Sequence, residues 1–366
     1  MPTQPKYPFD KKADGPVEID GSFGEGGGQI LRTALSLSCI TGTPVRIRNI
    51  RAGRAAPGLK PQHLLSAGAA ARISGGLLKG AEPGSMTIEF SPGPVRPGEY
   101  AFDVSEKKAS AGSTGLVFQT IAPPLFLASG PSSLVIRGGT HVEWSPPADY
   151  IKEVFLPVVK TMGVAAEFSN SLRGYYPIGG GQVEAAISPA SLPLKPLSLT
   201  ERGGLKRVSV LSAVSNLPRA IAERQLARAK TLLEAKGLPA PEGSAVEVPS
   251  PGKGTYVFIL AEFEKVRAGF SALGARGKRA EEVAGEAAEG LIEYLGKSGA
   301  LDAHLSDQVL LFMALARGAS EVTVSEVTNH LITNIHVIER LLPVSFNLRG
   351  TRGKEGRISV KGCGLV

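Results

Sequence analysis

A histidine at the start of a predicted helix is the residue best suited to covalent chemistry in this chain. His330 follows Thr328 and Asn329, two residue types that cap helix N-termini. Free N–H groups and the positive end of a helix dipole disfavour protonation of an imidazole and attract phosphate. We therefore expect an uncharged His330 beside a bound phosphate, where it could attack phosphorus. A half-buried histidine bonded to its neighbours, such as Thr333 and Asn334, is the structural alternative.

A glycine-rich turn offers a second position for chemistry. Residues 24–29 read Gly-Glu-Gly-Gly-Gly-Gln, and glycine lets a backbone turn sharply and approach a ligand closely. Gln29 stands where a dinucleotide fingerprint needs its last glycine, so that fingerprint is not met. Glu25 in this turn is a candidate ligand of Mg²⁺ or Mn²⁺. A carboxylate that only caps the turn fits the motif equally well.

Basic residues gather within and directly after a predicted strand at 45–50. Arg46 and Arg48 alternate within that strand and are expected on its solvated face. Arg51 and Arg54 fall in the following turn, and arginine is the residue type suited to bidentate phosphate contact. We therefore favour Arg51 and Arg54 as phosphate ligands.

An acid and an amide lie together at another predicted helix start. The segment from His304 reads His-Leu-Ser-Asp-Gln. Asp307 and Gln308 could hold a ribose, a metal or the edge of a base. They could equally be plain capping residues, because Asp is common at helix N-termini.

Three copies of one pattern are expected to position these residues. Each copy runs strand, small-residue turn, helix and strand, and the copies align on Gln29, Gln119 and Gln308. Each first helix is expected to end at a C-terminal capping glycine, and these are Gly42, Gly130 and Gly318.

The repeats predict an α/β (α+β) protein in which two helices pack on one face of a small mixed sheet in each copy. Residues 17–200 and 298–366 would form one large domain. Residues 201–297 interrupt the third copy and are predicted to be a smaller inserted α/β domain, with strands at 208–214, 255–262 and 266–273 and helices at 218–236 and 278–296. Residues 1–16 are expected to be a loose tail.

Composition narrows the class of protein. The chain has 366 residues, 42% of them hydrophobic and 20% charged, which is typical of a globular protein with room for two or more domains. No apolar run reaches the length of a membrane span, and the polar N-terminus lacks the apolar stretch of a signal peptide, so a cytoplasmic location is expected. Two cysteines form neither a disulfide framework nor a metal motif. The formal charge of +8 is compatible with a polyanionic partner.

With these residues assembled, residues 17–366 resemble the RNA 3′-terminal phosphate cyclase family. The resemblance rests on GEGGGQILR, RAGRAAPGLKPQH, RGYYPIGGG, the Asp-Gln pair at 307–308 and NHLITNIHVIERLLP. It implies three βαβαββ repeats with a smaller inserted α/β domain, a repeat that enolpyruvyl synthases share distantly. It also implies ATP-dependent conversion of an RNA 3′-phosphate to a 2′,3′-cyclic phosphate, through a covalent histidine–AMP intermediate and an adenylated RNA end, with release of pyrophosphate and AMP.

The resemblance also implies roles for individual residues. His330 matches the nucleophile and Glu25 the metal ligand. The positions that match phosphate or RNA contacts are Arg32, Arg51, Arg54 and Gln62. The positions that match nucleotide contacts are Gln119, Pro146, His304, Leu305, Ser306, Asp307 and Gln308. The implied enzyme is a ligase of nucleotidyl-transfer type that uses ATP with Mg²⁺ or Mn²⁺ and acts on RNA with a 3′-phosphate end; assembly into a homo-oligomer is left open.

One departure and two other readings accompany the resemblance. The family often has Tyr where this chain has His304, and an imidazole stacks more weakly on adenine, which puts adenine affinity in doubt. Cyclase-like ribosome-assembly proteins, which bind RNA without catalysis, keep the fold but lack the nucleophilic histidine that His330 matches. An enolpyruvyl transferase would need basic residues for a carboxylated substrate rather than a histidine at a helix start.

Overall fold

The computed structural model describes residues 15–104 and 110–364, which form a mixed α/β structure with four four-stranded sheets among the described residues. This confirms the predicted fold class. The predicted tail, residues 1–16, lies almost wholly outside the described residues. Among the described residues no helix is both long and apolar enough to cross a membrane.

The first sheet has the order β1-β2-β4-β3 and carries two helices. Its elements are β1 (Val17–Asp20), α1 (Gln29–Thr41), β2 (Val45–Arg48), α2 (Pro61–Ser74), β3 (Leu77–Lys79) and β4 (Ile88–Ser91). β1 pairs with β2 in parallel, and the other pairs are antiparallel. Arg46 and Arg48 make ion pairs with Glu18 on this sheet, as expected of a solvated face.

The second sheet repeats this arrangement with the order β5-β6-β8-β7. Its elements are β5 (Glu99–Asp103), α3 (Thr114–Phe126), β6 (Ser132–Gly138), α4 (Ala148–Tyr150), the π-helix η1 (Ile151–Phe155), α5 (Leu156–Thr161), β7 (Ala165–Leu172) and β8 (Gly181–Ser188). β5 and β6 are parallel, whereas β8 runs antiparallel to both β6 and β7.

The third sheet is assembled from two distant parts of the chain. Its elements are β9 (Ser198–Leu199), α8 (Leu305–Leu315), β14 (Arg317–Val324), α9 (Asn329–Leu341), β15 (Phe346–Gly350) and β16 (Gly356–Cys363). β9 pairs with β14 in parallel, and the order β15-β16-β14-β9 matches the first two sheets in the pattern of strand directions.

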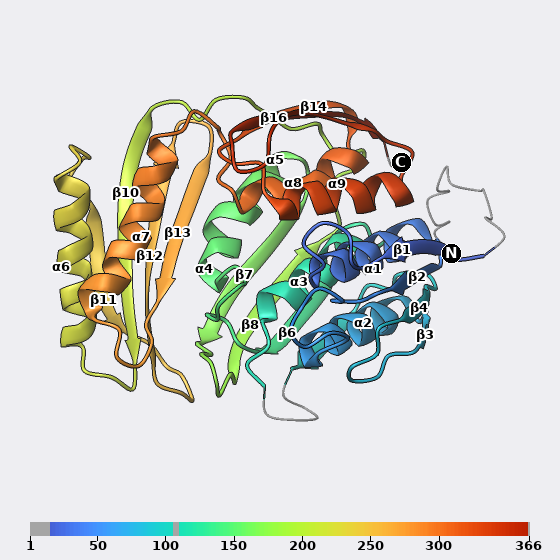
Figure 1. Ribbon diagram of the computed structural model, residues 1–366, viewed down its shortest axis with the longest axis horizontal. Coiled ribbons are helices and arrows are strands. Elements are labelled where there is room, and N and C mark those ends of the chain that lie inside the picture. Colours follow the sequence, from blue (N-terminus) through green and yellow to red (C-terminus); the bar gives the residue numbers. More distant parts are fainter. Residues whose placement is uncertain (1–14, 105–109, 365–366) are drawn as a thin grey trace.

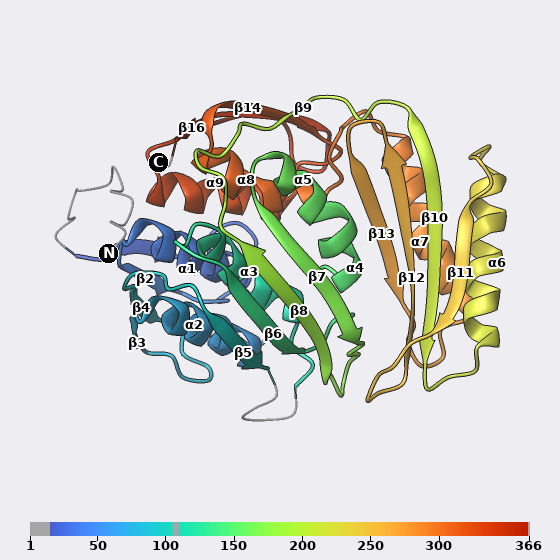
Figure 2. The same cartoon turned by 180° about the vertical axis from the view of Figure 1, so that it is seen from behind.

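The fourth sheet lies between β9 and α8 in the sequence and at one end of the molecule (Figure 1). Its elements are β10 (Leu205–Ser215), α6 (Ala220–Glu234), β11 (Glu242–Glu247), β12 (Gly254–Phe263), β13 (Arg267–Leu273) and α7 (Ala280–Leu295), in the strand order β11-β10-β12-β13. Figures 1 and 2 show α6 at the outer side of this sheet, and α7 packs against α6, β12 and β13.

Helices from the first three sheets meet in the centre of the molecule. α1 packs against α2, α3 and α9, and α8 packs against α9. Figures 1 and 2 both show α8 and α9 between the β14–β16 sheet and the α1 helix. Buried apolar side chains such as Leu35, Phe118 and Ile338 fill this region. The starts of several helices are thereby brought close together.

Two of the three predicted capping glycines are wrong. Gly42 does cap α1, with φ of 70° and an N–H bond to the Ser38 carbonyl. α3 ends earlier than expected, at Phe126, and its cap is Leu127 rather than Gly130. α8 passes directly into β14 through the extended residue Ala316, so Gly318 is a strand residue. Pairing with β16 replaces the left-handed cap there.

Candidate functional site

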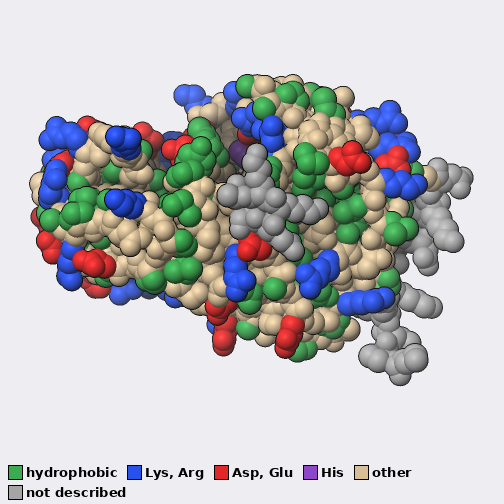
Figure 3. Space-filling view, turned by 90° about the horizontal axis from the view of Figure 1, so that it is seen from below, with side chains coloured by type: hydrophobic (Ala, Val, Ile, Leu, Met, Phe, Trp, Pro, Cys, Tyr) green, Lys and Arg blue, Asp and Glu red, His purple; other side chains and the backbone are tan. Residues whose placement is uncertain are grey.

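A cavity of about 1010 Å³ opens where the helix N-termini meet. Residues near the starts of α1, α2, α8 and α9 and along α3 line it, together with the segment 143–147 and residues of β13 and α7. From below, a histidine side chain is visible in a recess with Lys and Arg side chains at its edge (Figure 3). A helix N-terminus favours bound anions, so several of them facing one cavity form an environment suited to phosphate.

His330 occupies the first turn of α9 and faces this cavity. Thr328 caps the helix, because its side chain accepts a hydrogen bond of 3.0 Å from the Leu331 N–H, as predicted. The imidazole Nδ1 contacts Gln29 Oε1, and Nε2 lies 2.6 Å from Glu25 Oε2. The expected proximity of His330 and Glu25 is therefore observed, and it joins segments about 300 residues apart in the sequence.

In the protein without ligands, neighbouring carboxylates act against the expected loss of the His330 proton. Burial lowers the pKa of the imidazole, but the hydrogen bond with Glu25 and the negative charges of Asp307 and Glu25 outweigh it and raise the pKa above its usual 6.5. The same contact with His330 holds the Glu25 pKa below its ordinary range. A carboxylate in direct contact overrides the helix dipole because it is a full charge at hydrogen-bond distance.

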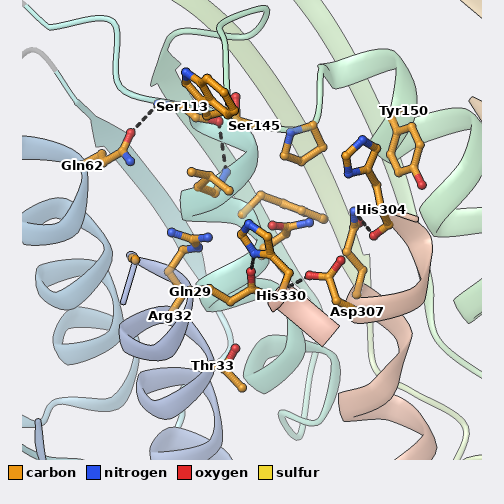
Figure 4. A pocket seen from close by; sticks show the side chains of 18 of the residues that line it. Gln29, Arg32, Thr33, Gln62, Ser113, Ser145, Tyr150, His304, Asp307 and His330 are labelled. Carbon is orange, nitrogen blue, oxygen red and sulfur yellow. Dashed lines mark hydrogen bonds between the residues drawn. The ribbon is translucent and has the colours of Figure 1, made fainter. Parts of the chain in front are cut away.

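Gln29 links the histidine to an acid. Its Nε2 donates a hydrogen bond of 2.5 Å to Asp307 Oδ2, while its Oε1 faces His330 Nδ1. Figure 4 shows Gln29 and Asp307 on either side of His330. The Asp307 carbonyl in turn accepts a bond of 2.9 Å from Asn334, whose Oδ1 accepts one of 2.6 Å from Thr33. The amide thus fixes the orientation of the imidazole and leaves Nε2 as the nitrogen turned toward Glu25.

The glycine turn presents Glu25 from a tightly folded backbone. Gly24 and Gly26, on either side, have φ of 63° and 61°, which favours glycine at both positions. The Glu25 N–H reaches Thr333 Oγ1 at 3.5 Å, and the carboxylate pairs with Arg54 as well as with His330. Among the described residues no cluster of three or more acidic, His or Cys ligands exists, so a metal here would depend on ligands from a substrate.

Arginine and neutral histidine line the cavity near this turn. Burial lowers the pKa of Arg32 to about 10, which leaves it charged at neutral pH. Arg51 donates to the Ala56 and Gly58 carbonyls at 2.6 and 3.2 Å and so holds its own loop. Burial, with the charges of Arg32 and Arg51, lowers the pKa of His63 to about 3. His63 is therefore uncharged, and its Nδ1 accepts a bond of 3.1 Å from the Lys60 N–H.

The predicted nucleotide contacts divide into two groups. Gln119 and Gln308 line the cavity, and each has a buried side-chain atom, Nε2 and Oε1 respectively, without a hydrogen-bond partner. Such orphaned polar atoms are uncommon and suit a ligand that completes them. Pro146 and His304 also line the cavity, and the His304 ring meets Tyr150 edge-on with centroids 6.4 Å apart.

Three other predicted contacts are placed differently. Leu305 and Ser306 are fully buried and are absent from the residues that line the cavity in the described chain. The Ser306 hydroxyl donates to the Ala303 carbonyl instead. Gln62 lines the cavity, but its Oε1 accepts a bond of 3.3 Å from the Ser113 N–H and so joins the starts of α2 and α3. Their predicted roles as ligands remain predictions.

Comparison with known proteins identifies the family. The family model for RNA 3′-terminal phosphate cyclase matches residues 23–348. The chain is 45% identical to the RNA 3′-terminal phosphate cyclase of Methylococcus capsulatus over 96% of its length and 95% of that protein. It is 44% identical to the protein of that name from Staphylothermus marinus, over 95% of this chain and 99% of the relative. The chain belongs to the RNA 3′-terminal phosphate cyclase family.

In this cyclase-family chain, the tertiary structure brings into the site several residues for which the sequence predicted no chemical role. Gln29 served only to align the repeats, yet it contacts the histidine. Tyr150 donates a bond of 2.7 Å to Asp302, whose Oδ1 accepts the His304 N–H at 2.9 Å. Trp144 lines the cavity although it is almost fully exposed. Trp144 could have been singled out from the sequence because it is the only tryptophan in the chain. Nothing in the sequence indicates the contacts of Gln29.

Proposed function

We propose that this protein is an ATP-dependent RNA 3′-terminal phosphate cyclase that works through a covalent histidine–AMP intermediate. The observation that carries the proposal is His330 in the first turn of α9, with Nδ1 held by Gln29 and Nε2 turned toward the cavity at Glu25. We further propose a cytoplasmic enzyme of the ligase, nucleotidyl-transfer type, with residues 17–200 and 298–366 as the catalytic domain and 201–297 as an insertion.

The first step is transfer of AMP to the enzyme. Nε2 of an unprotonated His330 attacks the α-phosphorus of ATP, a P–N bond forms, and the bond to the β-phosphate oxygen breaks to release pyrophosphate. Nδ1–H donates to Gln29 Oε1 and bears the positive charge that develops on the ring. Because contact with Glu25 raises the pKa of the ligand-free imidazole, that contact must be relieved before attack.

The second and third steps consume the intermediate. An oxygen of the RNA 3′-phosphate attacks the α-phosphorus, the P–N bond breaks, and the electron pair returns to Nε2. The neighbouring 2′-hydroxyl then attacks the 3′-phosphorus, loses its proton and expels AMP, which leaves a 2′,3′-cyclic phosphate. AMP is a good leaving group because ATP has already supplied the activation.

Charge compensation falls to residues around the glycine turn. Arg32, Arg51 and Arg54 offset the charge that builds on pyrophosphate and on the RNA phosphate. Glu25 would hold Mg²⁺ or Mn²⁺ together with phosphate oxygens, which fits a site with a single acidic ligand on this turn, because Mg²⁺ is usually held by one or two carboxylates plus substrate phosphates. When bound, the metal supplies further neutralisation of phosphate charge.

Nucleotide binding is assigned to the opposite part of the cavity. The unpaired Gln119 Nε2 and Gln308 Oε1 offer a donor and an acceptor to the nucleotide, and Pro146 and His304 offer faces to the adenine. The remaining proposed contacts in this part of the site are Leu305, Ser306 and Asp307, and Gln62 is proposed to act near the RNA phosphate.

Covalent labelling tests the proposal. Protein incubated with α-labelled ATP and Mg²⁺ should retain the label in a bond that is labile in acid and stable in alkali, as a phosphoramidate is. His330→Ala should take up none. His336→Ala is the matched control, because His336 lies on the same helix, stacks on Phe23 with centroids 3.9 Å apart, and is not among the residues that line the cavity in the described chain. Label on His330→Ala would show that the assignment is wrong.

A further inference from the structure

The single tryptophan of the chain is almost fully solvent-exposed at the edge of the cavity. Trp144 is the chain's only tryptophan and is 96% exposed, yet it lines the cavity that holds His330. Among the described residues no aromatic ring or cationic side chain packs on the indole. An indole left in water loses the stabilisation that burial would give, so this residue adds little to the stability of the fold.

The backbone that carries Trp144 is held in place, although the indole is not. Trp144 has φ of 60°, a left-handed conformation that strains a bulky side chain. The turn around it is closed by a 3.1 Å bond from the Ala148 N–H to the Thr140 carbonyl and by a 3.0 Å bond from Ser145 Oγ to the Val142 carbonyl. A strained residue on a fixed turn presents a flat apolar surface with little backbone entropy left to lose on binding.

The turn lies beside the start of α3. A Cβ atom at Gly115 would lie 3.0 Å from the Pro146 carbonyl, so the segment packs on the first turn of that helix. Figure 4 shows Ser145 near Ser113, the cap of α3, with His304 and Tyr150 further along the cavity. Trp144 is thus at the exposed rim, whereas the residues proposed for adenine lie along the cavity wall.

We propose that Trp144 stacks on a base at the 3′ end of the RNA substrate. This inference rests on the proposed function, in which the RNA phosphate must reach the nucleotide within the cavity while the rest of the RNA chain extends outward past the rim. The proposed function places the adenine against Pro146 and His304, so the RNA is the ligand assigned to the almost fully exposed side chain of Trp144. Arg51 and Arg54 line the same cavity and would hold phosphate charge.

The stacking surface also explains how such a site would accept different RNA ends. Every base has a flat π face, so an indole binds bases with little sequence preference. The chain has few aromatic residues, 6% in all, so it offers no extended stacking surface and one exposed indole would act at one base. Trp144 is therefore a substrate-binding residue and takes no part in the transfer of AMP to His330.

Fluorescence reports directly on this contact because Trp144 is the only indole in the chain. A short RNA with a 3′-phosphate, titrated into the protein without ATP, should quench the emission with the same midpoint as its binding measured on filters. ATP with Mg²⁺ should leave the emission unchanged. RNA that fails to bind, RNA that binds without changing the emission, or quenching by ATP alone would each overturn the proposal.

Substitutions separate stacking from general apolar contact. Trp144→Ala should raise the KM for RNA about 5- to 150-fold, the range expected for one base–aromatic stack, with kcat changed less than twofold. Trp144→Phe should restore most of the affinity, and Trp144→Leu, which keeps apolar bulk without a π face, should not. Leu77→Ala is the control, because Leu77 is 72% exposed on β3 and lies outside the cavity lining. An unchanged KM in Trp144→Ala overturns the proposal.

The same variants distinguish this inference from the proposed function. Labelling of the enzyme by ATP needs no RNA, so Trp144→Ala should label at the wild-type rate. Slower labelling with an unchanged KM for RNA would place Trp144 at the adenine and overturn the inference. If the wild-type protein takes up no label, the proposed function fails, and the fluorescence titration still decides whether RNA stacks on Trp144.

Discussion

Replacement of Gln29 by methionine should separate orientation of the nucleophile from its identity. Methionine has nearly the shape of glutamine but offers neither the acceptor for His330 Nδ1 nor the donor for Asp307 Oδ2. One hydrogen bond to a charged partner contributes about 1.5–3 kcal/mol. If the hydrogen bond to the imidazole stabilises the transition state by this full amount, its loss should slow the labelling of the enzyme by ATP about 10- to 150-fold.

The same substitution should also destabilise the protein. Asp307 is half-buried, and burial already raises the pKa of its carboxyl against the opposing effect of His330 and Gln29. Loss of the Gln29 donor leaves this acid short of a partner, which costs about 1–3 kcal/mol of the free energy of unfolding. The variant must therefore be assayed without denaturant, at a temperature at which circular dichroism shows that it is folded.

Gln225→Met is the matched control for the Gln29 experiment. Gln225 is fully buried on α6, and its Oε1 accepts bonds of 2.8 and 2.9 Å from Ser212 and Thr255. We expect a comparable loss of stability in urea titrations with no loss of labelling rate. Quench-flow measurement of the label gives the rate in each variant. A Gln29→Met rate within twofold of wild type would refute the reasoning that the amide orients His330.

Two further perturbations test the electrostatics and the packing of the site. Glu25→Gln should lower the pKa of His330 in the metal-free protein, which NMR titration measures; an unchanged pKa would contradict the ion pair. In the wild-type protein the pair raises the His330 pKa above 6.5 and lowers the Glu25 pKa below 4.5. The pair should therefore stabilise the fold most between pH 4.5 and 6.5, and less at higher and lower pH. Gly28→Ala should lower the free energy of unfolding by about 1–3 kcal/mol in urea titrations, because the new Cβ would overlap the buried His63 Nε2. Gly53→Ala is the control and should lower it less, because a Cβ there would have no atom within 4 Å. Equal stability of the two variants would contradict this packing.

Local sequence patterns predicted much of the fold. The strand predicted at 208–214 lies within β10, and Thr328 caps α9 as its residue type predicted. The strand β11 at Glu242–Glu247 was missed, because its sequence alternates weakly and its strand conformation depends on parallel pairing with β10. Gly130 and Gly318 were assigned to caps because a glycine after a helical stripe resembles one, although the chain had already left the helix in both places.

The sequence by itself determined the family, the α/β class, and the helix start and glycine turn that carry His330 and Glu25. These depend on short-range spacing, side-chain type and motifs that a linear chain displays directly. Only tertiary structure decided the direction in which the pKa of His330 is shifted, the bridging position of Gln29 and the placement of Trp144 at the cavity. A pKa depends on charges within a few ångströms, and the carboxylate in direct contact with His330 comes from Glu25, about 300 residues away in the sequence.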